Sequence, residues 1–212
     1  MAETRDIMTR LKEDTRGLHD AAEQQDYMRE LMSGTLSKDR FLEALQQLYL
    51  LHVGLEERLA TLRTKSPIAA GLVKDYHFAT AEAARQDLKD LGLSADGIEA
   101  NEGVREFHAR MDHWLATDPD AALGMFYVIE GSNNGGKILK NKLAELFALE
   151  GDSGVRHQDP HGAEMRPRWM AFVMAMKETP FSETTKDNIV SAANDAFRTV
   201  GLLYKGVAAQ VA

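Results

Sequence analysis

Hydrophobic residues recur at steps of three and four along almost the whole chain, which is the spacing of one face of an α-helix. No run of four to eight residues alternates between apolar and polar, as a half-buried β-strand would. The sequence therefore predicts an all-α protein, and 212 residues suit a single domain, 1–212. The clearest apolar stripe follows a capping Ser37 and contains Phe41, Leu45, Leu48, His52, Leu55 and Leu59.

Further helices are expected on both sides of this stripe, separated by turns rich in Gly, Pro, Ser and Asp. Residues 151–167 combine Gly, Asp, His and Pro with little periodicity, so they are expected to form a surface loop. The predicted helical segments are a first helix through Ile7, Leu11 and Leu18, a short helix opening at Ser66-Pro67, and segments near 27–32, 76–91, 103–116, 120–147, 168–177 and 182–205.

Composition excludes several classes of function. The absence of cysteine excludes disulfides, thiolate metal sites and cysteine nucleophiles. A formal net charge of -8 argues against general nucleic-acid binding, which needs a basic face. The first 20 residues lack the apolar core of a signal peptide, and no window resembles the roughly 20 apolar residues that span a bilayer. We expect a soluble, cytoplasmic protein that binds neither membrane nor nucleic acid, as a monomer or weak dimer.

The segment 127–143 is the strongest anomaly, because helical apolar spacing continues on both sides of a glycine-rich centre. Gly131, Gly135 and Gly136 each cost a helix about 1 kcal/mol relative to alanine. Glycine lets a helix bend and lets its backbone approach a ligand closely. A loop between two helices or close helix packing explains the pattern equally well. The spacing fits neither phosphate-loop nor dinucleotide fingerprints.

A second cluster lies near the amino terminus. Lys12 and Arg16 lie seven and three residues before His19, so all three share one face of a helix. The face is either a solvated basic surface with an incidental histidine or a site for an anionic ligand. His52 lies on the apolar stripe of the long helix, where a histidine is more often a hydrogen-bonded core residue than a functional one.

Two segments together resemble the heme oxygenase family. Residues 11–23, with Leu18-His19 followed by Ala22-Glu23, resemble the family's proximal helix, and residues 127–136 resemble its glycine-rich distal helix in the bacterial form. The two motifs occur in the family's order, and the last helix is also similar. The resemblance implies an all-α, single-domain fold that holds heme b between a proximal helix and a kinked distal helix.

The resemblance also implies roles for individual residues. His19 is the iron ligand, and Gly131 and Gly135 are the distal backbone that faces the heme. A porphyrin carries an iron at its centre and propionates at one edge, so a histidine with flanking cations suits it. The remaining heme-binding candidates are Lys12 and Arg16 for the propionates, with Gly136, Phe197 and Tyr204.

The distal motif departs from the mammalian pattern at one position. Mammalian-type members have an aspartate directly after the first distal glycine, whereas this chain has Ser132, whose hydroxyl carries no charge. His52 falls where many members place a polar group in the distal water network. Ser132 and His52 are therefore the candidates for assisting proton delivery.

The activity that the resemblance implies is oxidative cleavage of heme by O2 to biliverdin, carbon monoxide and iron. The chain has no flavin or nicotinamide fingerprint, so electrons must come from an external donor such as a ferredoxin or a reductase. Two alternatives stay open: a heme carrier or sensor without turnover, and a related helical fold that binds two metal ions or a small heterocycle. The expected helices contain no Glu-x-x-His pairs of the kind found in di-iron sites.

Overall fold

The computed structural model describes residues 5–207, and its regular elements are all helical. Four of them are short 3-10 helices, labelled η. The elements are α1 (Ile7–Asp14), α2 (Arg16–Glu23), α3 (Asp26–Ser33), α4 (Lys38–Lys65), α5 (Pro67–Leu72), η1 (Asp75–Phe78), α6 (Thr80–Asp90), α7 (Glu102–Thr117), η2 (Pro119–Ala121), α8 (Ala122–Phe147), η3 (Arg156–Gln158), η4 (Gly162–Glu164), α9 (Met165–Glu178) and α10 (Glu183–Gly206).

Serine caps define where three of these helices begin. The side chain of Ser37 accepts a hydrogen bond from the backbone N–H of Arg40, and Ser66 and Ser182 cap α5 and α10 in the same way. Each cap satisfies a backbone donor that has no partner within the helix. The predicted starts of the long helix and the last helix are confirmed.

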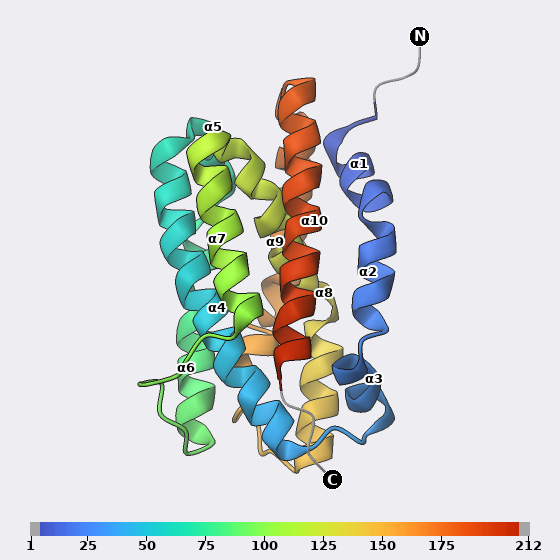
Figure 1. The fold of residues 1–212 in the computed structure, drawn as a ribbon, viewed down its shortest axis with the longest axis vertical. Helices are drawn as coiled ribbons and strands as arrows, with labels where there is room; N and C mark the ends of the chain where they lie inside the picture. Colours follow the sequence, from blue (N-terminus) through green and yellow to red (C-terminus); the bar gives the residue numbers. More distant parts are fainter. Residues whose placement is uncertain (1–4, 208–212) are drawn as a thin grey trace.

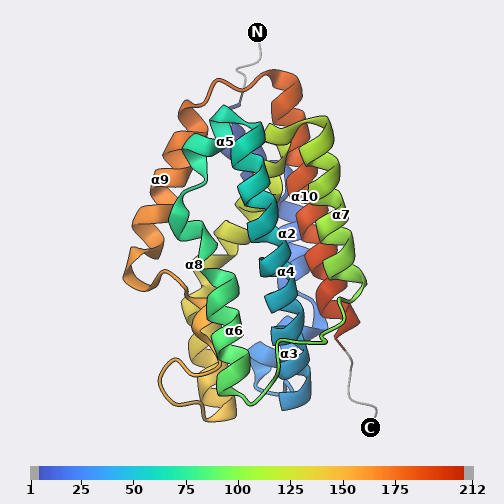
Figure 2. The same cartoon turned by 90° about the vertical axis from the view of Figure 1, so that its left-hand side faces the viewer.

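The long helices pack side by side around α10. This helix contacts α7 and α8 along much of its length, while α4 packs against α6 and α7 (Figures 1 and 2). α1 and α2 lie along the opposite side of α10 from α7 (Figure 1). The main hydrophobic cluster draws residues from α1, α3, α4, α5, α7, α8, α9 and α10, and a smaller cluster joins α4 to α6. The all-α prediction is confirmed.

Two predicted helices are divided in the structure. The first helix breaks at Thr15, so Lys12 belongs to α1, whereas Arg16 and His19 belong to α2. Thr15 is buried and its hydroxyl donates to the carbonyl of Leu11, which lies in the last full turn of α1. The predicted helix 76–91 is η1 followed by α6.

The glycine-rich segment does not interrupt its helix. α8 continues from Ala122 through the glycines to Phe147 and ends at Ala148 in the left-handed conformation. Of the two structural readings left open, the loop between helices is wrong for this segment.

Residues 151–167 are more ordered than a surface loop. They contain η3 and η4, and Val155, His157 and His161 are buried. η3 packs against α6 and α8. The sequence lacked helical periodicity here because the segment is held by individual contacts, not by a continuous apolar stripe.

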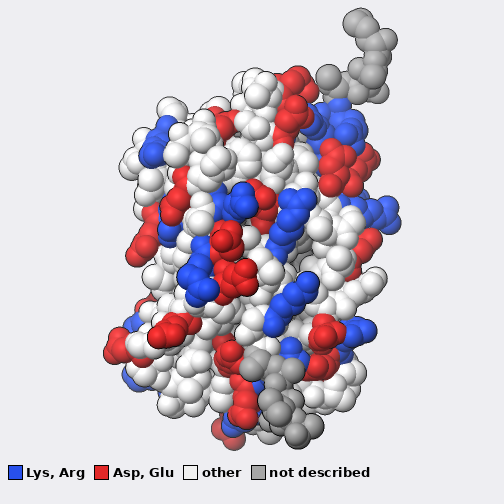
Figure 3. All heavy atoms as spheres, viewed as in Figure 1, with Lys and Arg blue, Asp and Glu red and all other residues white. Residues whose placement is uncertain are grey.

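Among the described residues, no helix is long and apolar enough to cross a membrane. On the face drawn in Figure 3, which carries α7, α10 and the amino-terminal helices, positive and negative side chains are intermixed.

Candidate heme site

A cavity of about 830 Å³ lies between the amino-terminal helices, α4, α8 and α10. This volume falls within the range of ligand pockets, about 300–1,000 Å³. Its walls are largely apolar, with Met28, Leu48, Leu51 and Leu139 among the lining side chains. Met32 and Ile138 also line it and are exposed at the surface, so the cavity is open to solvent beside them.

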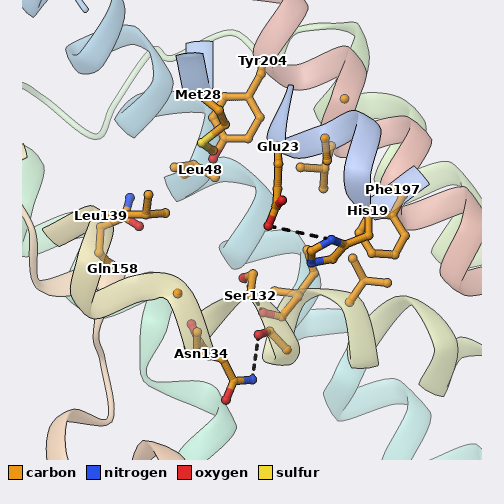
Figure 4. Close-up of a pocket in the computed structure, with 18 of the residues that line it drawn as sticks. His19, Glu23, Met28, Leu48, Ser132, Asn134, Leu139, Gln158, Phe197 and Tyr204 are labelled. Carbon is orange, nitrogen blue, oxygen red and sulfur yellow. Dashed lines mark hydrogen bonds and ion pairs between the residues drawn. The ribbon is translucent and has the colours of Figure 1, made fainter. Parts of the chain in front are cut away.

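His19 and Glu23 line the cavity from α2 (Figure 4). They are four residues apart, so they lie on one face of the helix. The His19 Nδ1 is 3.9 Å from a Glu23 carboxylate oxygen and 3.8 Å from one of Asp20. A carboxylate on the Nδ1 side favours a proton there, which leaves Nε2 free to bind a metal ion.

Gly131 and Gly135 line the cavity from α8. A Cβ atom at Gly135 would have no heavy atom within 4 Å, so this position faces open space. A Cβ at Gly131 would lie 3.2 Å from the ring of Trp169, which also lines the cavity. Gly135 therefore leaves room for a ligand, whereas Gly131 leaves room for Trp169.

Gly136 has a different role from its neighbour. It is buried and is absent from the cavity lining, and a Cβ there would lie 1.8 Å from the carbonyl oxygen of Gln158. Glycine at this position lets η3 approach the backbone of α8. Both suggested explanations for the glycines, ligand approach and close packing, thus apply within one helix turn.

Ser132 and Asn134 also reach the cavity from α8 (Figure 4). The Ser132 hydroxyl donates to the carbonyl of Ile129 at 2.7 Å, and the Asn134 amide donates to the carbonyl of Gly131 at 2.8 Å. Because its only proton is donated within the helix, the Ser132 oxygen is available to the cavity as an acceptor.

His52 lines the cavity from α4, and His157 and Gln158 line it from η3. Burial lowers the pKa of His52 to about 3, with a smaller contribution from His157, so His52 is neutral near pH 7. His157 contacts the buried carboxylate of Asp87 on α6. Besides His19, the cavity is therefore lined by two histidines that have different surroundings, His52 and His157.

Phe197 and Tyr204 line the cavity from α10. The Phe197 ring meets that of His19 edge to face, with centroids 5.9 Å apart. The Tyr204 ring packs on that of Tyr27 at 4.8 Å, and burial raises the pKa of Tyr204 to about 12, so it keeps its proton. The structure thus brings both residues to the cavity together with His19.

Lys12 and Arg16 are exposed, and neither lines the cavity. Arg16 is one turn before His19 on α2, whereas Lys12 lies on α1, beyond the break at Thr15. The predicted shared face is therefore not one continuous helix.

A buried polar cluster lies beside α8. The Nε2 atoms of His77 and His161 are 3.7 and 3.4 Å from the same carboxylate oxygen of Glu130. His77 Nδ1 accepts a hydrogen bond from the backbone N–H of Lys74, and His161 Nδ1 faces an Arg168 nitrogen at 3.1 Å. Each Nδ1 thus acts as an acceptor, which places the proton of the neutral ring on Nε2.

That protonation state directs both N–H groups towards Glu130, although neither forms a hydrogen bond with it at these distances. It also leaves no lone pair on Nε2 for a metal ion. Within residues 5–207, no group of three or more histidine and acidic side chains is arranged to hold a metal ion.

Several polar and aromatic lining residues had no predicted role of their own. Glu23 and Asn134 were visible inside the two motifs, Glu23 as part of the Ala-Glu pair four residues after His19. His157 and Gln158 were placed in a surface loop, and Trp169 carried no recognisable spacing signal.

The model of the Heme oxygenase family matches residues 5–204. The chain belongs to the heme oxygenase family. The match covers every helix that lines the cavity, and it agrees with the resemblance carried by the two motifs.

Curated family members are distant relatives of this chain. Heme oxygenase 1 of Synechocystis is 25% identical over 204 residues, covering 90% of this chain and 80% of the relative. Heme oxygenase 2 of Oryctolagus cuniculus is 25% identical over 198 residues, covering 91% of this chain and 63% of the relative. The chain therefore spans less than two thirds of the rabbit protein.

Solved structures share the fold. Heme oxygenase-1 of Synechocystis in complex with heme superposes with a TM-score of 0.85 at 21% identity, covering 95% of this chain and 91% of that one. A TenA homologue from Pyrococcus furiosus has a TM-score of 0.74 at 13% identity, covering 95% of this chain and 100% of that one. Because a protein with a different name shares the fold, function must be argued from the cavity.

Proposed function

We propose that this chain is a heme oxygenase that cleaves heme b with O2 to biliverdin, carbon monoxide and iron. The observation that carries the proposal is that His19 and Gly135 line one apolar cavity from different helices. The carboxylate of Glu23 lies on the Nδ1 side of His19, so Nε2 could bind an iron atom. Gly135 faces open space, and any side chain there would project into the cavity.

The side chains of the cavity fit a porphyrin. A flat apolar ring suits walls of leucine, methionine and aromatic side chains, and a single neutral imidazole suits its iron. Among the described residues, the lining contains no Lys or Arg that could pair with the propionates. We propose that they lie at the open edge, where Arg16, and Lys12 beyond it, are exposed.

Heme, when bound and reduced, supplies the O2 binding and the oxidising chemistry. The chain's contribution is to hold and surround it. His19 would bind the iron, with Glu23 beside its Nδ1, and Gly135 would leave space for the ring. Phe197 packs against the His19 ring. A thiolate ligand donates electron density strongly and thereby favours O–O cleavage. A neutral imidazole lacks this effect.

On the distal side, we propose that Ser132 and His52 hold water within the cavity. Ser132 accepts hydrogen bonds there because its own proton is donated to Ile129. His52 is neutral and has one donor and one acceptor nitrogen. Gly131 contributes backbone that lies against Trp169, while Gly136 fixes the position of η3. Tyr204 adds a protonated hydroxyl to the same cavity.

The electrons are proposed to come from an external ferredoxin or reductase, and the protein is proposed to act in the cytoplasm as a monomer or weak dimer. A non-catalytic heme carrier or sensor is the competing function, since Ser132 stands where mammalian-type members have an acid.

The experiment that tests the proposal is a heme titration followed by turnover. Purified protein is titrated with heme while its visible spectrum is recorded, and a reductant is then added in air with catalase present to remove free peroxide. Heme oxygenase activity replaces the heme spectrum with that of a bile pigment. A saturable heme spectrum that persists through reduction and aeration would establish the carrier and reject the enzyme.

A further inference from the structure

A buried carboxylate and a histidine form a pair in the wall of the cavity. The side chain of Asp87 is inaccessible to solvent, and that of His157 is 3% exposed. One Asp87 oxygen lies 2.8 Å from His157 Nδ1 and 2.9 Å from the backbone nitrogen of the same residue. The other oxygen accepts from Arg156 at 3.1 Å. Asp87 thus fixes both the backbone and the ring of His157.

The contacts determine which ring nitrogen carries the proton. A carboxylate bonded to Arg156 is an acceptor, so His157 Nδ1 must donate to it. In the neutral ring, Nε2 then has a free lone pair. This nitrogen is on the far side of the ring from Asp87 and lies 2.9 Å from the side-chain amide nitrogen of Gln158, which lines the cavity.

Gln158 can form a hydrogen bond with His157 Nε2 in either charge state of the ring. When Nε2 is unprotonated, the Gln158 N–H donates to it. When Nε2 is protonated, a half-turn of the amide presents its oxygen as an acceptor instead. The ring can therefore gain and lose a proton at Nε2 without breaking its bond to Asp87.

His157 and His52, which both line the cavity, differ in their partners. His157 donates from Nδ1 to a carboxylate at hydrogen-bond distance. Burial, together with the neighbouring His157, holds His52 neutral. The charged and titratable groups around His157 are Asp87 on α6, His52 on α4, and Arg156, which also binds Asp90.

We propose that His157 is a proton-transfer residue of the cavity, with Asp87 as its positioning residue. This inference rests on the proposed function and assigns it a proton donor that neither motif contains. Ser132 lacks the charge of a carboxylate and gives its hydrogen to Ile129, so α8 offers no obvious acid through that side chain.

The proposed step moves one proton and no electrons. The N–H bond at Nε2 breaks, an O–H bond forms on an oxygen acceptor in the cavity, and the ring becomes neutral. Asp87 stays ionised and bound to Arg156. Water entering the open side of the cavity returns a proton to Nε2, because Nδ1 keeps its own.

The first test reads the tautomer in the full-length protein without heme. The protein is labelled with ¹⁵N-histidine, and NMR spectra that correlate ring nitrogens with ring protons identify the protonated nitrogen. His157→Gln assigns the signal by its disappearance. We expect Nδ1 to carry a hydrogen-bonded proton both when Nε2 is protonated and when it is not. A ring without a proton on Nδ1 would overturn the proposal.

The second test compares heme binding with turnover. His157→Gln is expected to leave heme affinity within about twofold and to slow cleavage by about a hundredfold, the lower end of the range for lost acid–base catalysis. The solvent deuterium isotope effect on heme cleavage should also be larger in His157→Gln than in the wild-type protein. His113→Gln, the same change at an exposed histidine on α7 outside the cavity lining, is the matched control.

Asp87 is tested by its conservative variants. Asp87→Asn keeps an acceptor for Nδ1 and removes the charge, so it should slow cleavage with heme affinity retained, whereas Asp87→Glu should recover part of the rate. Unchanged cleavage in folded, heme-bound His157→Gln would reject the relay while leaving the proposed function intact. If wild-type protein binds heme without cleaving it, the proposed function fails. The position of the proton on the His157 ring then still tests whether Nδ1 donates to Asp87.

Discussion

The backbone of Gly136 in α8 lies directly against the carbonyl oxygen of Gln158 in η3. A Cβ at Gly136 would lie 1.8 Å from that oxygen, although at Gly135, one residue earlier, it would meet nothing within 4 Å. Adjacent glycines of one helix thus serve two purposes. Gly136 joins the helix to the segment that carries His157, and Gly135 keeps the cavity open.

This difference predicts opposite effects on stability. Gly136→Ala should lower the free energy of unfolding by roughly 1–3 kcal/mol, because the helix or η3 must move to relieve the clash. Gly135→Ala should raise it by up to about 1 kcal/mol, because alanine is the better helix former and has room. Urea denaturation of the heme-free proteins measures both. Equal effects in the two variants would contradict the assignment.

Gly135 is also predicted to control access to the cavity. Gly135→Leu should fold, because its side chain enters open space, but it should weaken heme binding by at least about tenfold by filling that space. Heme titration measures the affinity. Gly71→Leu is the matched control, since Gly71 lies in α5, is absent from the lining of the large cavity and also has nothing within 4 Å. Normal heme affinity in Gly135→Leu would remove this residue from the site.

Replacing His19 tests the ligand assignment. His19→Ala should keep the fold, because the side chain is 56% exposed, but it should shift the Soret band of bound heme and abolish turnover. Added imidazole should restore the band by entering the space left by the ring. An unchanged band in the variant would show that another group binds the iron.

Glu23 is predicted to have a smaller effect than His19. Its carboxylate is 3.9 Å from the ring nitrogen and its side chain is 71% exposed, so solvent weakens the interaction. Glu23→Gln should retain heme and slow turnover by less than about tenfold. Resonance Raman spectra should show a small change in the iron–histidine stretch, and loss of heme binding would contradict this ranking.

Acid should destabilise the protein through its buried neutral histidines. Burial lowers the pKa of His77 from 6.5 to about 4, so the unfolded chain binds this proton more readily. Stability is therefore complete above about pH 6.5 and is lost as the pH falls towards 4, by up to about 3 kcal/mol for this group.

His77→Asn, whose side-chain oxygen can still accept from Lys74, should reduce the pH dependence of urea denaturation between pH 7 and 5. His113→Asn, at an exposed position, should leave that dependence unchanged. The prediction fails if both variants retain the full wild-type dependence.

The sequence predicted the long helices well, because their apolar spacing and serine caps are local signals. Ser37 and Ser182 begin α4 and α10 as expected. The break at Thr15 was not visible, since apolar spacing continues from Leu11 to Leu18 and the break depends on a buried side-chain hydrogen bond. Local rules could not show that Lys12 and His19 lie on separate helices.

The site was harder to predict than the fold. His19, Gly135 and Phe197 were found through motifs, and the structure places all three around one cavity. His157 was not predicted to line the cavity, because its position depends on Asp87, 70 residues away in the sequence. Gly136 was assigned to the ligand because its actual neighbour, Gln158, belongs to a segment without periodicity.

Carbon monoxide release in a single turnover tests the central claim most directly. The heme-loaded protein is reduced in air with catalase present, and the gas is captured by reduced myoglobin. We expect carbon monoxide equimolar with the heme lost from wild-type protein, together with biliverdin, and none from His19→Ala without imidazole. Intact heme and no carbon monoxide from the wild-type protein would contradict it.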